Sequence, residues 1–96
     1  MKKVNIYQLD AYSKNIFMSY DFAKEHNFNL YDYKLVASFN TDKTDLEHIF
    51  FIGNNGSLKR HFIMRSLSVS DIIEIDGKKF FVDSFGFKEI EEEITL

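Results

Sequence analysis

The densest group of chemically capable side chains lies in the last third of the chain, where serines, aspartates and one arginine flank two apolar runs. Its members are Arg65, Ser66, Ser68, Ser70, Asp71, Asp83 and Ser84. A hydrolase would use one of these serines as the nucleophile and His61 as the base. The sequence has no G-x-S-x-G elbow to present such a serine. Serines and aspartates that precede a strand also act as hydrogen-bonded turn residues, and we weigh that structural role above a binding surface and above catalysis.

Metal and cofactor sites are not indicated. The three histidines, His26, His48 and His61, show neither H-x-x-x-H nor H-x-H spacing, and the chain has no cysteine. Metal sites need converging ligands, so the sequence predicts no metal and no cofactor. The GNNG segment at residues 53–56 also lacks the lysine and the Ser/Thr of a phosphate-binding loop.

Nucleic-acid contact is an open alternative. Lys59, Arg60 and Arg65 could form a basic patch beside neighbouring aromatic rings, a composition that suits single strands. The net charge of −3 argues against general nucleic-acid binding. The acidic run that includes Glu89 and residues 91–93 argues the same way, and we interpret it as a solvated helix end or a frayed segment.

A β-hairpin must position the Ser/Asp group. Asp76-Gly77 between two apolar runs predicts a two-residue turn, because both residues tolerate φ > 0. The register then sets Glu74 opposite Lys79, with a core face on one side and a half-solvated face on the other. Beyond Val82 the alternation changes phase, which predicts a bulge or bend near Ser84 that Gly86 would ease.

The remaining elements suggest one small α+β domain over residues 1–96. We expect a central strand at Val4–Leu9, a helix capped by Ser19 and ending near His26, and a half-buried strand at Tyr31–Phe39. In that strand the odd-numbered residues would share one face. A capping box at Thr44–Glu47 predicts a second helix that ends before Gly53, and Lys59–Met64 is ambiguous but leans towards a strand. The fold class is α+β, with a mixed or antiparallel sheet of four to five strands, two short helices and a C-terminal hairpin.

Composition is compatible with this fold. The chain has 96 residues, 45% of them apolar, and its eleven phenylalanines suggest a core of aromatic rings. No segment is typical of a signal peptide or of a membrane span. We therefore expect a cytoplasmic protein without membrane contact, either a monomer or a homodimer.

Two stretches resemble the YodL-like domain family. They are Asn5-Ile-Tyr-Gln-Leu9 and Ser66-Leu-Ser-Val-Ser-Asp-Ile-Ile73, the latter followed by Gly77, Phe81 and Val82-Asp-Ser-Phe-Gly-Phe87. The chain departs from the family pattern by lacking a proline before the second stretch. It also departs by carrying Phe80-Phe81 where the family has paired tyrosines. The resemblance covers most of the chain and implies a domain of plasmids, phages and conjugative elements, with anti-restriction genes as frequent neighbours and no established activity.

These observations lead to a functional hypothesis. We expect a non-enzymatic binding protein from a mobile element that inhibits a host defence nuclease by stoichiometric contact, such as an anti-CRISPR protein acting on Cas9 or its guide complex. The expected contact residues are Arg65, Ser68, Asp71, Glu74, Lys79, Phe81 and Asp83. The alternative is a nucleic-acid-binding accessory protein of a plasmid, phage or conjugative element.

Overall fold

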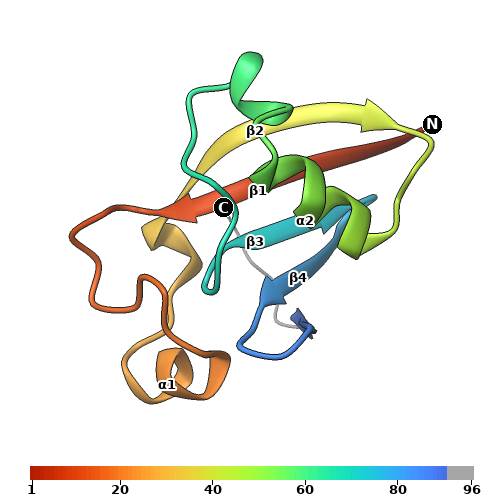
Figure 1. The fold of residues 1–96 in the computed structure, drawn as a ribbon. Helices are drawn as coiled ribbons and strands as arrows, with labels where there is room; N and C mark the ends of the chain where they lie inside the picture. Colours follow the sequence, from red (N-terminus) through yellow and green to blue (C-terminus); the bar gives the residue numbers. More distant parts are fainter. Residues whose placement is uncertain (91–96) are drawn as a thin grey trace.

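The protein is built on one antiparallel sheet. A computed structural model describes residues 1–90, in which the strands follow the order β2-β1-β3-β4-β5 (Figure 1). The strands are β1 (Lys2–Leu9), β2 (Tyr33–Thr41), β3 (Ile72–Ile75), β4 (Lys78–Val82) and β5 (Phe87–Ile90). The helices are α1 (Tyr20–Glu25) and α2 (Leu46–Asn54), with short 3-10 turns η1 (Leu30–Asp32) and η2 (Leu58–Arg60). This confirms the expected α+β class, and every pairing in the sheet is antiparallel.

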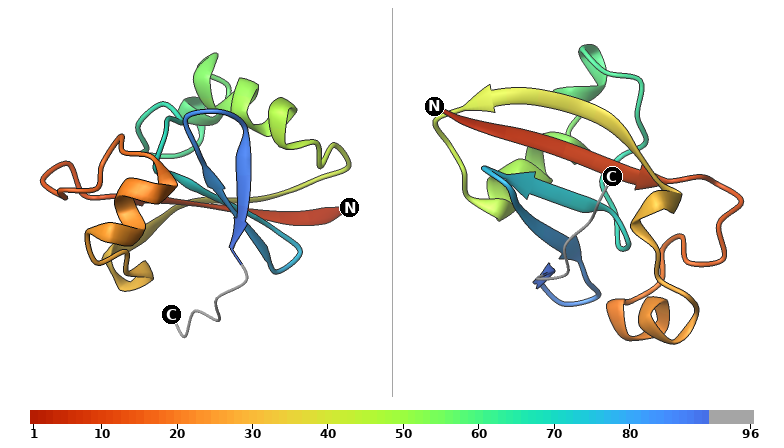
Figure 2. Two further views of the ribbon diagram at one scale, coloured as in Figure 1. Left: turned by 90° about the horizontal axis from the view of Figure 1, so that it is seen from below. Right: turned by 180° about the vertical axis from the view of Figure 1, so that it is seen from behind.

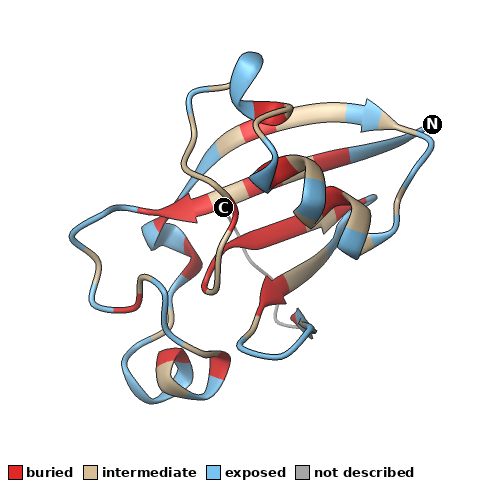
Figure 3. Ribbon diagram, in the orientation of Figure 1, coloured by how far each residue is buried: buried red, intermediate tan, exposed pale blue. Residues whose placement is uncertain are grey.

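The two helices lie on opposite faces of the sheet, so the protein has two small cores (Figure 2). Beneath α2 and η2, Ile49 and Leu58 pack with strand residues such as Ile6 and Ile73. Beneath α1, Tyr20 and other residues surround Phe81. Figure 3 shows buried positions along β1 and β3 and in both helices. Because a helix covers each face of the sheet, β1 and β3 carry apolar side chains on both of their faces.

The predicted hairpin of β3 and β4 is confirmed. Asp76 and Gly77 form its turn with φ of +48° and +86°. Glu74 pairs with Lys79, and their charged groups are 2.8 Å apart. The local turn chemistry therefore fixed this register as the sequence predicts.

The predicted bulge or bend near Ser84 is confirmed as a bend at residues 84–86. The chain turns at residues 83–86 and returns as β5, with Gly86 at φ +73° and a hydrogen bond of 3.0 Å from the Asp83 amide to the Gly86 carbonyl. The phase change thus marks a second hairpin. A bulge does occur across the sheet from it: Val82 donates to the Asp71 carbonyl and accepts from the Ser70 amide, so two residues oppose one.

Strand β2 also departs from the expected single face. Leu35 pairs with Tyr7 and Ala37 with Ile6, so Val36 is an extra residue between the two pairs. The odd-numbered residue Tyr33, before Val36, packs in the α1 core, whereas the odd-numbered Ala37 and Phe39, after it, pack in the α2 core, because a one-residue shift turns every later side chain over. Leu35 is 50% exposed.

The helix predictions are partly confirmed. Ser19 caps α1 by accepting from the Phe22 amide, and the helix ends at Glu25 with His26 as its C-cap, as expected. The buried residues of α1 are Tyr20 and Ala23. The cap of α2 is Asp45, which accepts from the Glu47 amide, and the helix continues through residue 53. The Thr44 capping box is therefore wrong by one position.

Three local expectations are corrected. Residues 58–60 form η2 rather than the start of a strand, and residues 61–71 have no regular structure until β3 begins. The strand expected from Tyr31 begins at Tyr33, after η1. Glu89 lies in β5 rather than at a helix end, while residues 91–93 of the acidic run lie outside the described residues.

Candidate functional site

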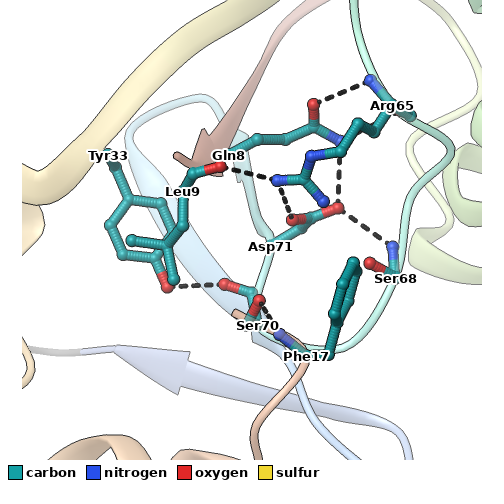
Figure 4. Close-up of polar contacts among 8 residues, drawn as sticks. All are labelled: Gln8, Leu9, Phe17, Tyr33, Arg65, Ser68, Ser70 and Asp71. Carbon is teal, nitrogen blue, oxygen red and sulfur yellow. Dashed lines mark hydrogen bonds and ion pairs between the residues drawn. The ribbon is translucent and has the colours of Figure 1, made fainter. Parts of the chain in front are cut away.

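The Ser/Asp segment folds around a buried carboxylate, Asp71, whose side chain has no exposed surface (Figure 4). Asp71 Oδ2 accepts hydrogen bonds from the Ser68 amide at 2.9 Å and from Gln8 Nε2 at 3.1 Å. Asp71 Oδ1 lies 3.9 Å from Arg65 Nη2. The donors satisfy Oδ2, whereas Oδ1 is buried without a hydrogen-bond partner among residues 1–90 and faces only the Arg65 charge. The hydrogen bonds to Oδ2 hold the bulge at the start of β3.

Gln8 fastens the same segment to the end of β1. Its amide nitrogen donates to the Arg65 carbonyl at 3.0 Å, and its amide oxygen accepts from the Arg65 backbone amide at 3.1 Å. Arg65 Nη2 also donates to the Leu9 carbonyl at 2.7 Å. The sequence pattern did not single out Gln8, although an amide side chain within an apolar central strand was an available signal for a buried partner.

Burial controls the electrostatics of this centre. It raises the pKa of Asp71 to about 6, against the opposing effects of the Ser68 and Gln8 hydrogen bonds and of the Arg65 charge. Burial, followed by the charges of Asp71 and Asp32, also raises the pKa of Tyr33. The Tyr33 hydroxyl donates to the Ser70 carbonyl, so it stays neutral and structural.

The centre has the features of turn chemistry rather than of a catalytic site. Ser70 is fully buried with φ +90°, and its hydroxyl accepts from the Phe17 amide at 2.9 Å. A substrate could not reach Asp71 or Ser70 without displacing the residues that cover them. Within residues 1–90, no group of three or more His, Cys, Asp or Glu side chains is arranged to hold a metal ion.

The expected contact residues do not form one surface. Phe81 and Asp71 have no exposed surface, so neither can contact a partner in this structure, and that part of the assignment is corrected. Phe81 fills the α1 core, where its ring centroid is 5.1 Å from that of Tyr20. Glu74 and Lys79 lie on the opposite sheet face from Asp71, because adjacent strand positions alternate.

Glu74 belongs to a polar ladder across four strands. Ser38 donates to Asn5 at 2.7 Å, Asn5 donates to Glu74 at 2.7 Å, and Lys79 completes the row. Burial raises the pKa of Glu74, but the hydrogen bonds from Lys79, Asn5 and Tyr7 and the Lys79 charge together lower it below its usual value. These side chains satisfy one another across the sheet, which is a structural role.

The basic residues are also divided. Lys59 and Arg60 are exposed in η2. The Arg65 guanidinium instead is held at the Asp71 centre and lies over the Phe17 ring, 5.5 Å from its centroid. Arg65 is therefore engaged by contacts within the protein, whereas Lys59 and Arg60 are exposed to solvent.

The exposed part of the expected surface gathers at one end of the sheet, together with two phenylalanines that the sequence did not indicate. Phe17 is 57% exposed and Phe85, at the tip of the β4–β5 turn, is 96% exposed. The Asp83 carboxylate accepts from the Tyr20 amide at 3.1 Å and so joins this turn to α1. The hydrogen bond of 2.9 Å from the Phe17 amide to Ser70 Oγ places Phe17 beside the loop that carries Ser68 (Figure 4). We define the aromatic rim as Phe17, Arg65, Ser68, Asp83 and Phe85.

Phe17 is held in a strained conformation. Its φ of +65° is a left-handed value that bulky residues rarely adopt. The hydrogen bond to Ser70 and the Arg65 guanidinium above the ring hold it there, as Figure 4 shows. No sequence pattern marks such a residue, because the strain is imposed by contacts that are distant in the chain.

Comparison with known proteins gives one match. Residues 3–92 match the family model described as YodL-like domain. Neither a curated protein sequence nor a solved structure matches the chain significantly. No helix within residues 1–90 has the length and apolar character needed to cross a membrane.

Proposed function

The chain belongs to the YodL-like domain family, and from that premise we propose that it is a binding protein that acts by stoichiometric protein–protein contact through the aromatic rim. The proposed partner is a host defence nuclease, for example a CRISPR effector, which the bound protein inhibits. The mobile-element context that the resemblance implies supports this class of partner.

The exposure of Phe17 carries the proposal. Backbone strain at a non-glycine residue costs stability and persists only where surrounding contacts enforce it, and such residues concentrate at functional sites. Here the strained backbone presents an aromatic ring that is 57% exposed and is covered on one side by the Arg65 guanidinium. Aromatic and arginine side chains are enriched among the residues that dominate binding energy at protein interfaces.

The interior polar groups support binding rather than chemistry. Asp71 and Ser70, the most chemically capable residues of the segment, are fully buried and hydrogen-bonded to the chain itself. Their hydrogen bonds hold the loop that carries Ser68 and fix Phe17 beside it. The buried centre thus acts as a support for the rim.

The test is an affinity capture with matched variants. The tagged protein is used to recover partners from a lysate of a Gram-positive host that expresses a type II CRISPR system, with mass spectrometry as the readout. We expect stoichiometric recovery of the effector nuclease. Phe17→Ala and Phe85→Ala should each weaken binding about 30-fold, as truncation of a dominant interface residue does.

Tyr12→Ala is the control, because Tyr12 is 95% exposed and lies outside the rim. Its recovery of the nuclease should equal that of the unaltered protein. Equal binding by Phe17→Ala and Phe85→Ala would contradict the assignment of the rim. Recovery of nucleic acid alone, with a steep loss at higher salt, would contradict the protein partner and favour the accessory role.

A further inference from the structure

An apolar hollow lies beside the aromatic rim, between α2 and the turn that joins β4 to β5 (Figure 2). Its volume is about 330 Å³, and its apolar lining comes from Phe50, Val69, Val82 and Phe87. Phe50 and Phe87 meet edge to face, with ring centroids 6.2 Å apart. A hollow of this volume is at the small end of the range for ligand sites, so it suits one side chain rather than a cofactor.

Two carboxylates border this hollow. Glu47 comes from the first turn of α2, and Asp83 comes from the turn after β4. The hydrogen bonds that Asp83 accepts, from the Tyr20 amide at 3.1 Å and from the Ser84 amide at 2.8 Å, both end on Oδ1. Within residues 1–90, Asp83 Oδ2 and the Glu47 carboxylate have no hydrogen-bond or ion-pair partner. The described residues that line the hollow include no lysine, arginine or histidine, so its negative charges are not balanced within it.

An arginine side chain fits this combination of groups. Its apolar stem can lie against apolar surface while its charged head stays at the border. The planar guanidinium stacks on aromatic rings, and its fork of N–H donors matches the geometry of carboxylates. Phe50 and Phe87 supply the rings, and Glu47 and Asp83 supply the acceptors. An apolar side chain would leave both carboxylates without a counter-charge, and an anionic side chain would be repelled by them.

The hollow belongs to the same surface as the aromatic rim. Asp83 is a member of both, and Phe85 stands in the chain between Ser84 and Gly86, which line the hollow. A partner that contacts Phe85 therefore has its surface within reach of the hollow. Proteins that act on nucleic acids contact phosphates through arginines and lysines, so a nuclease has such side chains to offer.

We propose that this hollow is a subsite for an arginine of the partner protein, which lies against Phe50 and Phe87 and pairs with Glu47 and Asp83. The inference rests on the proposed function, because it names the chemical group that the partner contributes to the interface. An arginine held in this way is withheld from nucleic-acid phosphates, which gives stoichiometric contact a route to inhibition.

A titration of the isolated full chain with N-acetyl-arginine amide, followed by the amide chemical shifts in NMR, tests the subsite without the nuclease. We expect the largest shifts at Glu47, Phe50, Asp83 and Phe87, with a dissociation constant on the order of 1 mM, as the ligand efficiency of small molecules allows. The matched N-acetyl-citrulline amide has nearly the same shape without the charge and should cause no saturating shift. Equal shifts with both probes, or shifts elsewhere in the chain, would overturn the proposal.

Charge-removing variants locate the probe. Glu47→Gln and Asp83→Asn keep the size of each side chain, and the asparagine oxygen can still accept from the Tyr20 amide. Each substitution should raise the dissociation constant of the probe about threefold, and both together about tenfold, as exposed ion pairs do. Glu25→Gln removes the same charge from the exposed end of α1, on the other face of the sheet, and should leave the constant unchanged. Unchanged binding of the probe by the double variant would overturn the proposal.

The capture experiment separates the failure of this inference from the failure of the proposed function. If the double variant recovers the nuclease as well as the unaltered protein does, while Phe17→Ala loses it, the arginine subsite is wrong and the proposed function stands. If no nuclease is recovered although the probe titrates at the hollow, the proposed function is wrong and the arginine site stands.

Discussion

Replacing Asp71 by asparagine tests the physical account of the buried centre. Asparagine keeps the shape of the side chain, and its single oxygen can accept the hydrogen bonds of the Ser68 amide and of Gln8 that the carboxylate accepts now. The substitution removes the charge whose burial dominates the electrostatics of the site. The effect on stability should therefore depend on pH.

The magnitude follows from the pKa of Asp71, which burial raises from 3.8 to about 6. The folded protein binds this proton more tightly than the unfolded chain does, so stability falls as the pH rises between these values. The contribution of Asp71 is fully present below pH 3.8 and is lost as the pH passes through about 6. A difference of about two pKa units corresponds to about 3 kcal/mol of unfolding free energy.

The assay is urea unfolding of the unaltered protein and of Asp71→Asn at several values from about pH 3.5 to about pH 7.5. The difference in unfolding free energy between the two should shift by about 3 kcal/mol in favour of the variant across this window. Taking the difference cancels the contributions of the other titratable groups to the unfolding free energy. These include Glu74, whose lowered pKa makes stability rise with pH. Asp42→Asn, at a side chain that is 81% exposed, is the matched control.

Two results would refute the reasoning. A difference that stays flat with pH would mean that the Asp71 carboxylate has the same proton affinity in the folded and unfolded chains. A shift in the opposite direction would mean that the Ser68, Gln8 and Arg65 interactions outweigh desolvation, so the centre would be a stabilising ion pair.

Three further predictions concern packing and strain. In Gly53→Ala the new Cβ would lie 2.3 Å from Leu67 Cδ1, in a core site where Leu67 is 2% exposed. Urea unfolding should show that the free energy of unfolding falls by about 1–3 kcal/mol, and an equal or higher value would contradict the close packing. Phe81→Ala removes a ring with no exposed surface and should cost about 3–5 kcal/mol in the same assay, whereas a cost below about 1 kcal/mol would mean that the α1 core is loosely packed. Phe17→Gly should be about 1 kcal/mol more stable than Phe17→Ala, because φ at this position is +65°, and the usual preference for alanine would disprove the strain.

Much of the fold could be predicted where local rules decide it. The hairpin depended on two residues that accept positive φ, and Ser19 capped α1 through a hydrogen bond within its own first turn. The single face expected for β2 was wrong, because alternation in the sequence does not show the extra residue at Val36. The phase change after Val82 indicated a bulge or bend, and only the pairing of β5 with β4 shows that the bend is the turn of a second hairpin.

The candidate site was less predictable. The sequence indicated Arg65, Ser68 and Asp71 as one polar group, and the structure brings them together. Their chemistry did not reveal that Asp71 is inside and that Phe17 is outside. Exposure is a property of what packs over a residue, and for Asp71 this includes a side chain 63 positions away, Gln8.

The sequence by itself determined the class of the fold, the Asp76-Gly77 hairpin and the positions of the two helices to within a residue or two, because short-range sterics and hydrogen bonds govern these features. Only the tertiary structure decided which side chains of the polar segment are buried, which face each half of β2 presents and where Phe17 lies. Those features depend on contacts between segments that are far apart in the chain. A local sequence pattern does not specify which of several compatible segments packs on a given residue.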